Sequence, residues 1–205
     1  MNPIRSAIGN AGDKTGATGS EGGVRVKMAK WKRYVLTNDA DGKSYTKSTE
    51  ATMEKEEPGV FYRIDVWATA ETPVDNSIEE DRALNSLTRE PKPCGATFRT
   101  LELWPDKQGA EREEQREKIE ALHHAVGQKH MPTAEDYDRH PSMHRTDTLD
   151  IIYCVRGEIW LMTDLDEVLM TPGDVTVIRG VNHAWSNRSN EPALLVGAML
   201  DAIPR

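Results

Sequence analysis

The chain has 205 residues, of which 37% are hydrophobic and 29% are charged. This length suits one compact domain with added segments. Because 34 acidic residues outnumber 26 basic ones, the formal net charge is −8. Such a surface repels phosphate backbones and anionic lipids, so we expect neither nucleic acid nor a membrane as a partner.

Two cysteines, Cys94 and Cys154, stand far apart in the sequence and form no CxxC pair. They can build neither a disulfide framework nor a zinc knuckle, which favours a reducing compartment. No apolar run reaches the roughly 18 residues of a membrane span, and the first residues lack the apolar stretch of a secretory signal. We therefore expect a cytoplasmic protein.

Composition divides the chain into four segments. Residues 1–30 are rich in Gly, Ser and Thr, which predicts a flexible tail. Residues 31–110 hold strand-like runs that we expect to extend the sheets of the C-terminal part. Residues 111–143 hold a helix and a loop, and residues 144–205 form the core. The strands expected in the second segment are 31–36, 43–48, 60–69 and 97–104.

The helix is expected over residues 111–126 because its apolar residues recur at helical spacing. Gly127 is placed to end it. His123 and His124 fall in its last turn, where a positive imidazole is stabilised by the helix dipole. We therefore assign both histidines a structural role.

Residues 144–205 consist almost entirely of short strands separated by turn residues. Tight turns are expected at Gly157 and Gly173. Strands at such regular spacing predict an antiparallel sandwich or barrel rather than βαβ units. The expected strands are 149–155, 158–163, 167–170, 174–178, 184–187 and 193–201.

Two motifs lie on these strands. In the first, His144 is followed after five residues by Asp150 and after six more by Gly157. The second contains Pro172-Gly173-Asp174, Gly180, His183 and Asn187. Both resemble the paired motifs of the cupin family. The resemblance implies an all-β cupin double-stranded β-helix, or jelly-roll barrel, with an N-terminal strand extension and one surface helix.

The first motif departs from the family pattern at two ligand positions. Thr146 stands where the family has a second histidine, and Asp150 replaces a longer glutamate. Residues 144, 146 and 150 share parity on one expected strand, so they should face the same side. With His183 they predict a site of two imidazoles and one carboxylate, suited to iron, zinc, manganese or nickel.

The neighbouring residues suggest a pocket for a small molecule. An apolar, aromatic cavity with a few polar groups is how such sites are built. His140 is a candidate fourth ligand, although a loop position suits it better, and His130 is expected at the surface. The expected pocket residues are Trp67, Trp104, Ile152, Cys154, Arg179 and Trp185.

Three functions remain open. The first is a metal-dependent enzyme (oxygenase, decarboxylase or isomerase) acting on a small organic, possibly aromatic or carboxylated, molecule. It would act through a divalent metal on His144, Asp150 and His183, and Thr146 would offer a hydroxyl. The second is a metal-free carrier or sensor of a small hydrophobic ligand. The third is metal-free acid–base catalysis, with His144 or His183 as base and Asp150 orienting it. The resemblance also implies a homodimer, for which residues 31–48 and 60–69 are the candidate exchange strands.

Overall fold

The computed structural model describes residues 32–50, 54–57, 60–85 and 88–204. The flexible tail predicted for residues 1–30 lies outside these ranges. No helix of the described residues is long and apolar enough to cross a membrane.

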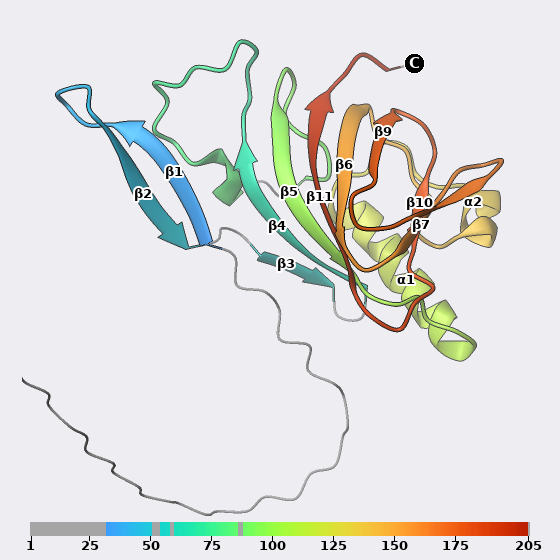
Figure 1. Cartoon of the computed structure of the whole chain (residues 1–205). Coiled ribbons are helices and arrows are strands. Elements are labelled where there is room, and N and C mark those ends of the chain that lie inside the picture. The colour runs from blue at the N-terminus through green and yellow to red at the C-terminus, as the bar shows by residue number, and fades with distance from the viewer. Residues whose placement is uncertain (1–31, 51–53, 58–59, 86–87, 205) are drawn as a thin grey trace, which may run out of the picture. The chain divides into compact units, whose positions relative to one another are not determined.

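Two antiparallel sheets form the main body of the fold (Figure 1). The larger has six strands in the order β3-β4-β5-β11-β6-β9, and the smaller has three in the order β10-β7-β8. The larger sheet consists of β3 (Glu54–Glu57), β4 (Phe61–Ala68), β5 (Ala96–Leu103), β11 (Ala193–Asp201), β6 (Thr148–Arg156) and β9 (Val175–Arg179). The smaller consists of β10 (Ala184–Ser186), β7 (Ile159–Met162) and β8 (Glu167–Met170).

A short bridge completes the smaller sheet. His144 pairs antiparallel with His183, just before β10, so that the segment around residue 144 lies beside that strand. The two sheets then run β5-β11-β6-β9 and 144-β10-β7-β8. In each sheet the neighbours are mostly distant in sequence, which is the strand order of a double-stranded β-helix, or jelly roll. The fold class predicted from the sequence is confirmed.

Turn residues fix the ends of the motif strands. Gly157 has φ 74°, and a Cβ there would lie 2.9 Å from the Cα of Ala193, so both backbone conformation and space require glycine. Gly173 follows Pro172 with φ 107°, a turn that an L side chain rarely adopts. These turns send β6 to β7 and β8 to β9, from one sheet to the other.

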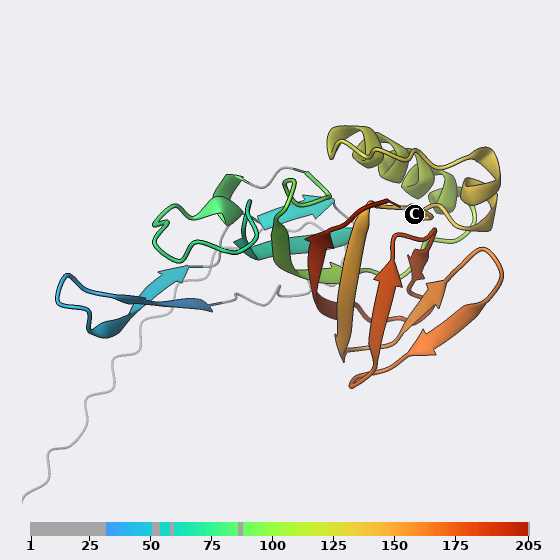
Figure 2. The same ribbon diagram turned by 90° about the horizontal axis from the view of Figure 1, so that it is seen from above.

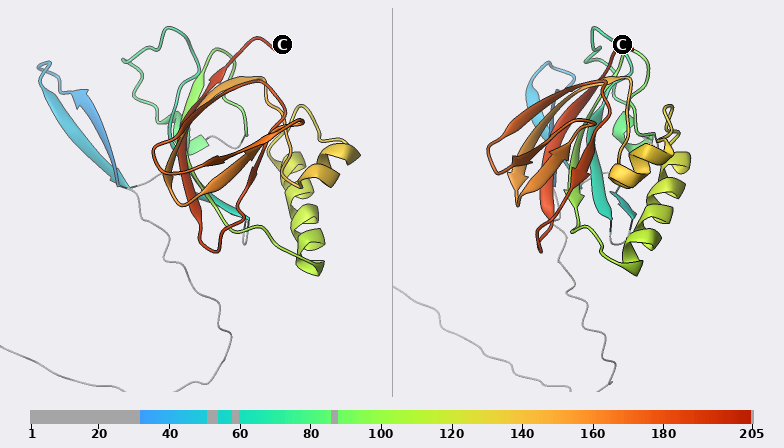
Figure 3. Two further views of the ribbon diagram at one scale, coloured as in Figure 1. Left: turned by 45° about the vertical axis from the view of Figure 1, so that its right-hand side comes forward. Right: turned by 90° about the vertical axis from the view of Figure 1, so that its right-hand side faces the viewer.

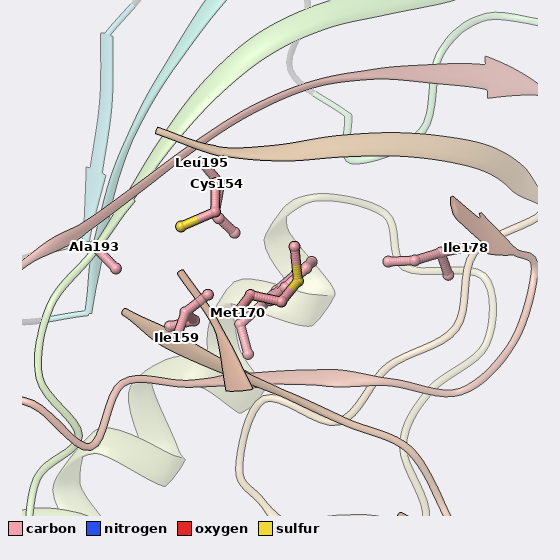
Figure 4. Packing of buried hydrophobic residues seen from close by; sticks show 7 residues of the cluster. Cys154, Ile159, Met170, Ile178, Ala193 and Leu195 are labelled. Atoms are coloured by element: carbon pink, nitrogen blue, oxygen red, sulfur yellow. The ribbon is translucent and has the colours of Figure 1, made fainter. Parts of the chain in front are cut away.

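The core lies between the two sheets (Figure 4), which face each other in Figure 2. The larger sheet supplies Cys154, Ile178 and Leu195, and the smaller sheet supplies Ile159, Met170 and Trp185. All six are buried. Burial of each large apolar side chain contributes roughly 1.5–3 kcal/mol, so this cluster stabilises the contact between the sheets.

The helices partly depart from the sequence prediction (Figure 3). Helix α1 (Ala110–Ala125) confirms the expected helix to within one residue at each end. The six-residue helix α2 (Ala134–Arg139) and the 3-10 turn η1 (Arg82–Asn85) were not expected. Helix α2 carries no long apolar stripe; a capping box at Thr133, whose hydroxyl accepts from the Asp136 N–H at 3.2 Å, stabilises it instead.

The N-terminal strands divide into two groups. Strands β4 and β5 extend the larger sheet. In contrast, β1 (Lys32–Asn38) and β2 (Ser44–Glu50) pair with each other as a separate two-stranded sheet. Arg33 of β1 donates to the Val66 carbonyl at 3.0 Å and forms an ion pair with Asp81. The hairpin therefore contacts β4 through side chains and does not extend its sheet.

Candidate functional site

A cavity of about 150 Å³ lies between the larger sheet, the start of β10 and helix α1. Most of its wall is apolar, from the two sheets and from the buried face of α1. The polar side chains that reach it are Arg63, Arg89, Arg99, His123, Ser142, His144, Asp150 and His183. An apolar cavity with convergent polar groups is the usual form of a small-molecule site.

Two imidazoles are held side by side at this cavity by the backbone. The N–H of His144 donates to the His183 carbonyl at 2.9 Å, and the N–H of His183 donates back at 3.0 Å. The ring centroids are 4.4 Å apart and the rings are tilted by 49°. This spacing follows from the β-bridge, because directly opposed residues of paired strands place their side chains on the same side.

Hydrogen bonds define the tautomer of each ring. Nδ1 of His144 lies 2.8 Å from the Ser142 carbonyl oxygen, and Nδ1 of His183 lies 2.9 Å from that of Val181. A carbonyl only accepts, so each Nδ1 carries the proton. Each neutral ring therefore has a lone pair at Nε2.

Both imidazoles are neutral at neutral pH. Burial lowers the pKa of His183 to about 4, which outweighs its hydrogen bond to Val181. Burial also lowers the pKa of His144 well below its usual value, and the positive charge of Arg89 lowers it further. The pair offers acceptors and carries no charge.

Asp150 brings a carboxyl group to the same cavity from β6. Its side chain is 4% exposed, and its Oδ1 has no hydrogen-bond partner. Burial raises its pKa to about 6, against the opposing effects of a hydrogen bond to Thr148 and the charge of Arg99. This carboxyl group therefore titrates close to neutral pH.

His144, Asp150 and His183 line one cavity, but a metal site on them is not shown. Within the described residues, no group of three His, Cys, Asp or Glu side chains is placed to hold a metal ion. His144 and Asp150 do not share one strand, because β6 begins only at Thr148 while His144 pairs with His183 beside the smaller sheet. Thr146 is buried in the connecting segment, bonds the Thr148 hydroxyl at 2.7 Å, and does not line the cavity.

His123 is a cavity residue that the sequence analysis misassigned. It is 1% exposed, and its ring centroid lies 6.3 Å from that of His144. Burial lowers its pKa to about 3, so the expected positive imidazole at the helix end is wrong for this residue. Ile119 and His123 of α1 and Val126 at its C-cap all line the cavity. That shared spacing with apolar residues was the available signal.

Buried arginines form a second polar group that the sequence analysis did not find. Arg63 and Asp65 of β4 lie opposite Leu101 and Arg99 of β5. The Asp65 carboxylate forms ion pairs with Arg63 at 3.1 Å and with Arg99 at 3.0 Å. Arg99 also donates from Nη1 to the Arg89 carbonyl at 2.9 Å. The signal in the sequence was Arg63 and Asp65 sharing parity in a strand.

Two of the expected pocket residues, Ile152 and Trp185, line the cavity. The other four lie elsewhere. Cys154 is further along β6, inside the hydrophobic cluster, and Arg179 is exposed. A register shift between Asp65 and residue 67 of β4 accompanies the outward position of Trp67, which packs against Arg33. Trp104 follows β5 and does not reach the cavity.

The remaining histidines also lie outside the cavity. Nδ1 of His140 lies 2.8 Å from the Ser142 hydroxyl, and its Nε2 lies 3.3 Å from Asp106. His130 pairs with Asp147 at 2.7 Å. Neither residue lines the cavity, so His140 is not a further ligand beside His144.

No family model matches the chain. A segment of 49 residues is 47% identical to "Phomopsin biosynthesis cluster protein C'" of Diaporthe leptostromiformis, covering 23% of this chain and 26% of that protein. A segment of 66 residues is 42% identical to "Oryzines biosynthesis cluster protein J" of Aspergillus oryzae, covering 31% of this chain and 37% of that protein. The chain thus matches about a quarter to a third of the length of these relatives.

Solved structures with similar folds include KdgF from a Halomonas species, at TM-score 0.40 and 12% identity, covering 74% of this chain and 89% of that one. An RmlC-like cupin from Shewanella frigidimarina gives TM-score 0.39 and 12% identity, covering 74% and 85%. The jelly-roll strand order and the two motifs define the fold of this chain as a cupin fold.

Proposed function

We propose that this chain is a cupin-fold enzyme that transfers a proton to or from a small organic molecule in the cavity, without a metal. The observation that supports the proposal is a buried carboxyl group, Asp150, with one unpartnered oxygen, in a cavity that also holds two neutral imidazoles. This arrangement corresponds to the third function considered from the sequence, with the roles of the residues exchanged.

Asp150 is the proton-transfer group in this proposal. General acid–base catalysis is most efficient when the pKa of the group lies near the working pH, and the pKa of Asp150 is about 6. The pKa of His183, about 4, makes that ring a weak base. Nε2 of His144 and of His183 instead accepts hydrogen bonds from a hydroxyl or N–H group of the substrate and so orients it.

The relatives support a biosynthetic role. Both matched proteins are named for biosynthesis clusters, and the identities of 47% and 42% apply to short segments. We therefore place the proposed reaction in a biosynthetic route, as an isomerisation, elimination or cyclisation that needs a base. None of these reactions requires an external oxidant or reductant.

Hydrogen–deuterium exchange tests the proposal. The protein is incubated in D2O with a panel of small 2-oxo acids and their methyl esters, and loss of the C3 proton signal is followed by NMR. We expect exchange that persists in EDTA and falls about 10²-fold or more in Asp150→Asn. Arg179→Gln, an exposed change outside the cavity, serves as the matched control.

Two outcomes favour the other functions. Exchange that is abolished by EDTA and restored by iron, zinc, manganese or nickel would replace the proposal with a metal-dependent enzyme. A ligand that raises Tm without any exchange across the panel would favour a carrier or sensor.

A further inference from the structure

Nη2 of Arg99 is a buried donor nitrogen with neither a hydrogen bond nor an ion-pair contact among the described residues. The residue is 7% exposed and lines the cavity. Its Nε lies 3.0 Å from Asp65 Oδ1, and its Nη1 donates to the Arg89 carbonyl. Its Nη2 has no hydrogen-bond partner. A buried donor of a charged group that makes no hydrogen bond destabilises the fold, so a ligand that accepts from it gains affinity.

The charges around this nitrogen are unbalanced. Arg63, Arg89 and Arg99 all line the cavity. The single carboxylate of Asp65 is shared between Arg63 and Arg99, because it forms ion pairs with both. The neighbouring acid Glu90 is ion-paired with Lys129 instead. Even with Asp150 ionised, the cavity and its immediate lining keep an excess of positive charge.

The remaining acid, Asp150, feels the charge of Arg99 but forms no direct ion pair with it. Among the residues that the structure describes, no ion pair joins Asp150 to an arginine, and its Oδ1 is unpartnered as well. The cavity lining therefore presents an unengaged donor, Nη2 of Arg99, and an unpartnered oxygen, Oδ1 of Asp150. A ligand with both an anionic group and a hydrogen-bonding or acidic C–H group satisfies both.

Volume and walls limit the size of this ligand. A cavity of about 150 Å³ is the size known to hold a benzene-sized molecule. Phe61, Leu101 and Leu195 supply apolar wall beside the arginines. Because Nε and Nη1 of Arg99 face Asp65 and the Arg89 carbonyl, a ligand carboxylate is left with Nη2, from which it accepts a charge-assisted hydrogen bond.

We propose that the cavity binds a small carboxylic acid, aromatic or branched, whose carboxylate accepts from Nη2 of Arg99 and is neutralised with the help of Arg89. This inference deepens the proposed function by naming its substrate class. The inference rests on the proposed function only where it calls the acid a substrate, because binding of the acid is measured without turnover.

Calorimetric titration with benzoate, and with benzamide as a neutral molecule of the same shape, tests the proposal. We expect wild-type protein to bind benzoate at least tenfold more tightly than benzamide. Arg99→Gln should lower benzoate affinity at least tenfold and leave benzamide affinity unchanged. Arg179→Gln changes the same residue type at an exposed position and should leave both affinities unchanged.

Equal affinity for the two compounds, or no benzoate binding at 20 mM (about 10²-fold above a Kd in the 10⁻⁴ M range), would overturn the proposal. So would unaltered benzoate affinity in folded Arg99→Gln protein. If Arg99→Gln does not fold, the wild-type comparison and Arg89→Gln, expected to weaken benzoate binding severalfold, decide the matter. Benzoate binding without proton exchange on the 2-oxo acid panel would contradict the proposed function alone, whereas exchange on the esters without benzoate binding would contradict this inference alone.

Discussion

The polar groups on the two sides of the cavity differ in charge. The six-stranded sheet supplies charged groups: Arg63 from β4, Arg99 from β5 and Asp150 from β6. The opposite side supplies neutral rings, His144 and His183 beside β10 together with His123 from α1. The same burial therefore has two outcomes, since the arginines remain charged with a shared counterion while the imidazoles lose their protons.

The difference follows from the ordinary pKa of each group. Burial lowers the pKa of Arg63 to about 9 and that of Arg89 to about 10, and both stay protonated at neutral pH. A histidine starts near 6.5, so the same physical cause removes its charge. One side can therefore bind an anion while the other accepts hydrogen bonds.

The largest expected effect comes from removing the shared counterion of the charged side. Asp65→Asn leaves Arg63 and Arg99 buried without their carboxylate, which should cost about 3–5 kcal/mol of unfolding free energy. Urea unfolding measures it. The control is Glu79→Gln, which breaks the exposed pair with Lys47 and should cost less than about 1 kcal/mol. Equal costs would show that the charged side is not held by Asp65.

The neutral histidines should make the unfolding free energy depend on pH. Because the pKa of His183 falls to about 4 in the folded chain, the unfolded chain binds more protons between pH 6.5 and 4. The stability from this residue is therefore full above pH 6.5 and falls by about 3 kcal/mol as the pH drops to 4. Unfolding free energies of wild type and His183→Gln across this range should show a shallower acid loss in the variant.

The contribution of Asp150 to stability should change with pH in the opposite direction. Its pKa is raised to about 6, so its protonated form stabilises the fold at low pH and this contribution is lost as the pH rises from 3.8 to 6. Asp150→Asn should therefore make the acid loss of stability steeper. Parallel pH curves for wild type, His183→Gln and Asp150→Asn would remove the proposed contrast between the two sides.

The smallest expected effect is at Arg179. The sequence suggested it as a pocket residue that holds an anion, but its side chain is exposed outside the cavity. Arg179→Gln should change the unfolding free energy by no more than about 0.5 kcal/mol. A loss of more than about 1 kcal/mol in urea unfolding would mean that this residue has a structural role that its exposure does not suggest.

Local signals predicted the fold well. The limits of β8 and β11 and the turns at Gly157 and Gly173 follow from short runs of sequence, and the structure confirms them. Each depends on neighbouring residues, such as alternating side chains ended by glycine or proline. Helix α2 was not predicted because it is short and is stabilised by its cap.

The site was harder to predict because its geometry depends on distant partners. His144 and Asp150 are six positions apart, yet they lie beside different sheets, so counting parity along one strand fails. Arg99 meets Asp65 only through the pairing of β4 with β5, which a single strand does not encode. His123 was assigned by its place at a helix end, while the face that it occupies determines its burial.

The backbone bridge between His144 and His183 also has a consequence for folding. Four strands, β6 to β9, lie between these two residues in the chain. Contacts between such distant segments form late, because the intervening chain must first be ordered. We therefore expect the imidazole pair to form only after the strands between its two residues are in place, so that a partly folded chain lacks the ligand site.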